Sequence, residues 1–90
     1  MSSLSHEISK LACEVRRHRV HDQRITKELT MIVGYGRLIE IEPKLQYMIS
    51  LQKHLIVLID LVYESGHTEL HQRSGLILQS LMRKDRADAA

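Results

Sequence analysis

A heptad seam occupies the first half of the chain and constrains its fold more than any other feature. Side chains in strict four-three spacing, all apolar except two, run over five heptads: Leu4, Ile8, Leu11, Val15, His18, Asp22, Ile25, Leu29, Ile32, Gly36 and Ile39. This spacing keeps one narrow stripe in register, which is typical of a helix that packs lengthwise against other helices. The pattern therefore predicts an all-α protein.

Three helices are predicted from the positions of proline, glycine and N-cap residues. Pro43 disfavours helical geometry at the residue before it, and Gly66 can adopt the left-handed conformation that ends a helix. Thr68 is a good N-cap for the segment that follows. The predicted helices cover residues 4–41, 44–64 and 68–84, and residues 85–90 are expected to fray.

Two glycines weaken the first of these helices. Gly34 and Gly36 lie well inside the heptad pattern, and each costs about 1 kcal/mol relative to alanine in a helix interior. A helix interrupted at these glycines is the alternative to a continuous one.

The second predicted helix carries two apolar stripes. One consists of Leu51, Leu55, Leu58 and Val62, and the other of Ile49, Ile56, Ile59 and Tyr63. We expect a single domain over residues 1–90, in which the long first helix packs antiparallel against a broken two-helix return arm, as a helical hairpin or three-helix bundle. One stripe serves this packing. The Leu51, Leu55, Leu58 and Val62 stripe is assigned to a partner, so a homodimer is expected.

Composition indicates a reducing compartment. Cys13 is the single cysteine and no apolar leader opens the chain, so a cytoplasmic protein is expected. The longest uncharged apolar run, residues 55–59, is far shorter than the roughly 20 residues that cross a bilayer. We therefore predict no membrane partner.

No nucleophile, base and orienting residue can be assembled from the sequence into a catalytic group. The excess of apolar surface instead favours a non-enzymatic protein–protein interaction module, such as a small regulator, adaptor or chaperone, which binds an unidentified protein. No cofactor is predicted.

A basic stripe on the first predicted helix favours an alternative function. The candidate phosphate-contacting residues are Arg16, Arg17, Arg24 and Lys27. Several cations on one helix can bind a phosphate backbone, so a nucleic-acid-binding accessory protein is the first alternative.

Histidines indicate a second alternative, a metal-responsive bundle. His18 and Asp22 lie at consecutive seam positions, where they are expected either to form a polar layer that sets oligomeric state or to supply metal ligands from two subunits. His67 and His71 have the same spacing of four residues. Surface or capping roles are the competing interpretation for this second pair.

Overall fold

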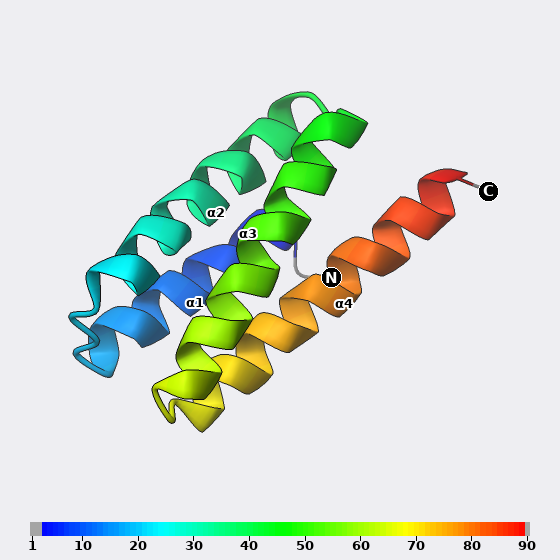
Figure 1. Ribbon diagram of the computed structural model, residues 1–90. Coiled ribbons are helices and arrows are strands. Elements are labelled where there is room, and N and C mark those ends of the chain that lie inside the picture. The colour runs from blue at the N-terminus through cyan, green and yellow to red at the C-terminus, as the bar shows by residue number, and fades with distance from the viewer. Residues whose placement is uncertain (1–2, 90) are drawn as a thin grey trace.

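The computed structural model describes the backbone of residues 3–89 and the side chains of residues 3–83, and it consists of four helices (Figure 1). These are α1 (Leu4–Arg17), α2 (Gln23–Ile41), α3 (Leu45–Glu64) and α4 (Thr68–Ala89). Each helix runs antiparallel to the next and α1 also packs against α4, so the four close into an up-and-down bundle. The predicted all-α bundle is confirmed, and no strand occurs within residues 3–89.

The single long first helix predicted over residues 4–41 is wrong, because the chain turns back on itself between α1 and α2. Arg19 in this turn has a left-handed φ of 53°. Asp22 then caps α2, with its Oδ1 accepting a hydrogen bond from the backbone N–H of Arg24 at 2.9 Å. A short carboxylate competes well for backbone donors, which favours a helix start over a helix interior.

The two glycines interrupt nothing, since α2 is continuous through both. A Cβ atom at Gly36 would lie 2.7 Å from Ile8 Cδ1, so glycine here lets α1 approach α2 closely. A Cβ atom at Gly34 would meet nothing within 4 Å. The alternative of a helix interrupted at residues 34–36 is therefore wrong, and the two glycines have different surroundings.

The second predicted helix, residues 44–64, agrees closely with α3, and Gly66 follows it with a φ of 77°. The start of α4 at Thr68 is also as predicted. The end of α4 differs from the prediction. The helix was predicted to end at residue 84 with residues 85–90 frayed, whereas the backbone is helical to Ala89. Strong helix formers such as alanine, arginine and lysine favour this extension. Residue 90 lies outside the described residues.

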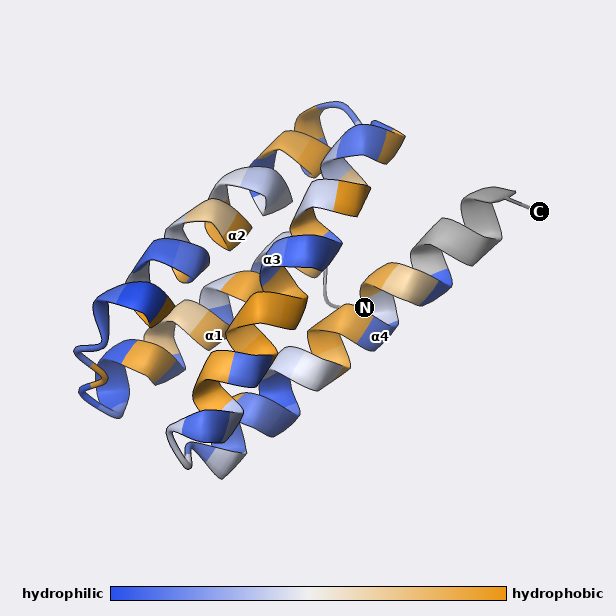
Figure 2. Cartoon of the chain, viewed as in Figure 1, coloured by the Kyte–Doolittle hydropathy of each residue, from blue (hydrophilic) through white to orange (hydrophobic). Residues whose placement is uncertain are grey.

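Each helix contributes one aliphatic stripe to a common core, while hydrophilic residues dominate the turn between α1 and α2 (Figure 2). The core residues are Ile8, Leu11, Val15, Ile25, Ile32, Ile39, Met48, Leu51, Leu55, Leu58, Val62, Leu70, Ile77 and Leu81. The six seam residues between Ile8 and Ile39 in this set show that the heptad pattern correctly identified the buried face of both α1 and α2.

The stripe assigned to a partner lies inside this core. Leu51, Leu55, Leu58 and Val62 are each 0% exposed within the single chain, so their assignment to a dimer interface is wrong. α3 contacts both α2 and α4, and these contacts cover that stripe. The other stripe is largely exposed, since Ile49 and Ile56 are both 44% exposed and Tyr63 is 71% exposed. Leu45 and Val57 of α3 are exposed as well.

Helix α3 is also long and apolar enough to cross a membrane by its length and composition, with a mean hydropathy of 1.3 over its most apolar window. The core helix of a bundle meets the same criteria, and α3 is the helix that supplies Leu51, Leu55 and Leu58 to the core. The absence of a membrane partner stays a prediction.

Candidate functional site

A groove of about 650 Å³ runs along the outer face of α1 and α2. Its lining on α2 extends from Thr26 to Arg37, which corresponds to about 17 Å at 1.5 Å per residue. The complete lining is Ala12, Val15, Arg16, Arg19, Val20, His21, Thr26, Leu29, Thr30, Val33, Gly34 and Arg37. The groove is therefore about three helical turns long.

The floor of the groove is apolar because it is the edge of the bundle core. Ala12 and Val15 are buried on α1. Val20, Leu29 and Val33 pack partly buried against the core from the turn and from α2. Gly34 contributes no side chain, and the space above it is open. A ligand in the groove would cover aliphatic surface that water otherwise contacts.

The rim of the groove is cationic. Arg16, Arg19 and Arg37 are exposed, and none forms a salt bridge with the side chains described in residues 3–83. His21 is the fourth basic side chain of the lining. No aspartate or glutamate belongs to the described lining, so the groove combines an aliphatic floor with uncompensated positive charge.

Two cations of the predicted phosphate-contacting stripe form salt bridges with nearby carboxylates. Arg17 donates to Glu14 Oε1 at 2.6 Å, and Arg24 donates from Nε and from its terminal nitrogen to the two oxygens of Asp22 at 3.2 and 3.0 Å. Arg16 lines the groove and Lys27 does not. Arg16 and Arg17 lie on α1, whereas Arg24 and Lys27 lie on α2. The turn between the two helices therefore divides the four cations, and the continuous stripe predicted on one helix is wrong.

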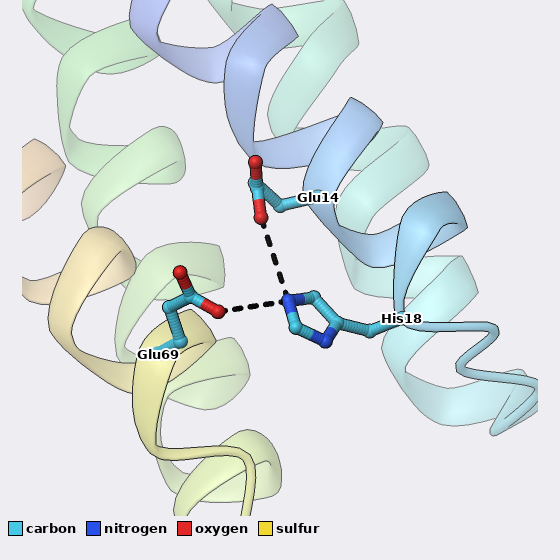
Figure 3. A group of neighbouring side chains, drawn as sticks. All are labelled: Glu14, His18 and Glu69. Atoms are coloured by element: carbon cyan, nitrogen blue, oxygen red, sulfur yellow. Dashed lines mark ion pairs between the residues drawn. The ribbon is translucent and has the colours of Figure 1, made fainter.

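The predicted polar layer of His18 and Asp22 is also wrong, because both residues lie at the turn and outside the core. His18 caps the end of α1, and Asp22 caps the start of α2. Instead, the His18 ring lies between two carboxylates (Figure 3). Its Nε2 is 3.0 Å from Glu69 Oε2 and 3.4 Å from Glu14 Oε2.

The other histidine pair makes different contacts. The His71 ring packs against the Tyr63 ring with centroids 5.3 Å apart, and His67 lines a small cavity beside His18. The cluster of potential metal ligands in the described residues is Glu14, His18 and Glu69, which includes neither His67 nor His71. Sequence reasoning missed both glutamates. Glu14 has a local signal, four residues before His18, but Glu69 comes from a different helix.

Asp22 gives a prediction about pH. Hydrogen bonds from the Arg24 guanidinium, and then from its backbone N–H, hold the pKa of Asp22 below its ordinary value of 3.8. Because the folded-state pKa is lowered, the stabilisation is fully present above pH 3.8 and is lost as pH falls through the folded-state value. We expect Asp22→Asn, which keeps a capping side chain, to lower the Tm by a few degrees at neutral pH.

The difference in Tm between wild type and Asp22→Asn should shrink as the pH is lowered below 3.8. Thermal melts followed by circular dichroism over a pH series measure it. A difference that stays constant down to the most acidic sample would contradict an ionised, paired Asp22.

Comparison with protein-family models, with curated proteins and with solved structures finds no match. Function is therefore inferred from the groove and from the side-chain clusters themselves.

Proposed function

We propose that the protein is a non-enzymatic interaction module that binds an acidic amphipathic helix of a partner protein in the groove between α1 and α2. The observation that carries the proposal is the combination of an aliphatic floor, three arginines that form no salt bridge with the side chains of residues 3–83, and a described lining without aspartate or glutamate. This combination complements a helix with one apolar face and glutamates or aspartates beside that face.

A helix fits the shape of the groove. Two antiparallel helices leave a straight furrow between them, and an amphipathic helix places apolar side chains into such a furrow at every third or fourth position. The lining from Thr26 to Arg37 accommodates about three turns. Leu29 and Val33, one turn apart on α2, would contact successive apolar residues of the bound helix.

The arginines would determine which helices bind in the groove and in which orientation they bind. Guanidinium groups bind carboxylates in a bidentate geometry. Charge pairs at the rim of an interface contribute mainly to specificity and association rate, whereas the covered apolar surface supplies most of the affinity. Arg16 and Arg19 come from the turn end of the groove and Arg37 from the other end. Acidic residues near both ends of the bound helix would therefore be favoured.

Nucleic acid is a less suitable ligand for the same surface. Phosphate contacts need accessible cations, and Arg17 and Arg24 already pair with Glu14 and Asp22. The aliphatic floor of the groove has no role in binding a phosphate backbone. Tight binding of duplex DNA would therefore contradict the proposed function.

The proposal is tested with designed peptides of about 18 residues, long enough to form a helix on binding. The first peptide has leucine at every third or fourth position with glutamates beside the leucines. The second has lysine in place of each glutamate. By fluorescence anisotropy, wild type should bind the glutamate peptide at least tenfold more tightly than the lysine peptide. Equal affinities would contradict the proposal.

Two glycines give a matched pair of variants for locating the site. Gly34 and Gly75 both lie in helix interiors, and a Cβ atom at either would meet nothing within 4 Å. Leucine is the better helix former at both positions. Gly34→Leu fills the groove and should weaken binding of the glutamate peptide at least tenfold, whereas Gly75→Leu on α4 should leave it unchanged. Equal effects of the two variants would place the peptide elsewhere.

A further inference from the structure

We propose that Glu14, His18 and Glu69 form a binding site for a divalent transition-metal ion, with Zn²⁺ as the best fit, between the end of α1 and the start of α4. One nitrogen and two carboxylate oxygens are available, and all lie within 4.8 Å of one another. Imidazole and carboxylate ligands suit Zn²⁺ and its neighbours in the first transition row.

The separations match the geometry of zinc coordination. Bonds of about 2.1 Å in a tetrahedral zinc site place adjacent ligand atoms roughly 3.4 Å apart. The distances from His18 Nε2 are 3.4 Å to Glu14 Oε2 and 3.0 Å to Glu69 Oε2. An ion between the three atoms would bind the deprotonated Nε2, and the two carboxylate oxygens lie within 4.8 Å of each other. The three side chains point toward a common centre (Figure 3).

Glu14 supplies an independent sign that a ligand is accommodated. Its side chain is 14% exposed, and Oε2 is buried with no hydrogen-bond partner among the described residues. A buried carboxylate oxygen without a donor is costly. Arg17 already binds the other oxygen, Oε1, at 2.6 Å, and thereby orients Oε2 toward His18. A cation at this point would satisfy Oε2 directly.

The fourth coordination position can be filled by water. A cavity of about 260 Å³ lies against His18 and Glu69, and its wall also includes His67 and Thr68. Two arginines lie near the site, since Arg17 and Arg73 both help to lower the pKa of Glu14. The positive charge of the two arginines repels a bound cation. The negative charges of Glu14 and Glu69 offset this repulsion, so both carboxylates are expected to be ligands.

The site would join elements that are far apart in the sequence. Glu14 and His18 come from the last turn and cap of α1, and Glu69 comes from the first turn of α4. An ion that binds all three stabilises the folded chain relative to the unfolded chain. The inference does not depend on the proposed function, because the groove between α1 and α2 uses other residues.

Calorimetric titration of the metal-free full chain with Zn²⁺ tests the proposal, with Co²⁺ absorption reporting the coordination geometry. We expect one ion per chain, the intense visible absorption of tetrahedral Co²⁺ and a raised Tm in zinc. Glu14→Gln, His18→Gln and Glu69→Gln should each weaken zinc binding at least tenfold. His6→Gln, an exposed histidine on the first turn of α1, is the matched control and should bind as wild type does.

Thermal melts without metal show that each variant is folded before its affinity is compared. No binding of zinc by wild type would overturn the proposal. Binding that survives His18→Gln and is lost in His67→Gln would overturn it equally, because the ion would then use the other histidine pair.

Discussion

Leu55→Ala is expected to lower the free energy of unfolding by about 2–5 kcal/mol, whereas Ile56→Ala, at the next position of α3, should change it by less than about 1 kcal/mol. Leu55 is 0% exposed and belongs to the core, while Ile56 is 44% exposed. Alanine at residue 55 leaves a cavity among side chains from the other helices. Alanine at residue 56 removes carbons that solvent already reaches. Urea denaturation followed by circular dichroism measures both values.

The two variants control for each other, because each shortens a branched aliphatic side chain to alanine in the same helix. The slope of free energy against urea concentration should be the same for both. Equal and large losses of stability would contradict this account. That result, if it depended on protein concentration, would show that a second chain covers Ile56.

Reversing the charge of the groove rim should reverse the preference for the peptide. The triple variant Arg16→Glu, Arg19→Glu and Arg37→Glu is expected to bind the glutamate peptide at least tenfold more weakly and to bind the lysine peptide more tightly than wild type does. All three side chains line the groove and are exposed, so folding should change little. Three lost attractions and three new repulsions together exceed the roughly 1.4 kcal/mol that a tenfold change requires.

A control variant has the same net charge with the groove intact. Lys27→Glu, Lys53→Glu and Arg83→Glu change three exposed cations outside the lining. This variant should keep the preference of wild type for the glutamate peptide, measured by anisotropy at physiological salt. If both triple variants lose binding equally, net charge and not the groove governs the interaction. Tight binding of wild type to duplex DNA, lost only in the groove variant, would favour nucleic acid as the ligand.

The heptad pattern identified the buried residues of α1 and α2 but not the turn between them. Val15 and Ile25 are both core residues, one on each helix. Because α2 folds back on α1, both stripes face the same interior, and four-three spacing continues in the sequence across the turn. The polar residues at seam positions, His18 and Asp22, were the local sign of a helix end, since aspartate is a better N-cap than helix interior residue.

Periodicity could not show which stripe of α3 is buried. Leu55 and Ile56 belong to stripes that are both apolar, and which of the two stripes is buried depends on how many helices surround α3. In the predicted fold, where α1 and α2 form one long helix, too few helices surround α3 to cover both of its apolar stripes. With four helices, α2 and α4 flank α3 and cover Leu51, Leu55 and Leu58.

The candidate sites depend on contacts between helices, which local spacing does not encode. Arg16 and Arg37 border one groove only because α1 and α2 are antiparallel. Glu14 and His18 could be paired from their spacing of four residues. Glu69 joins them only when α4 packs against α1.

The most direct test of the groove as a binding site is a map of backbone amide chemical shifts in the ¹⁵N-labelled chain during titration with the glutamate peptide. We predict that the shifts that change most lie along the groove, from Ala12 through the turn to Arg37, and that those of α4 change little. Changes concentrated on the exposed stripe of α3 around Ile49, Ile56 and Tyr63, with the groove unaffected, would contradict the proposed function.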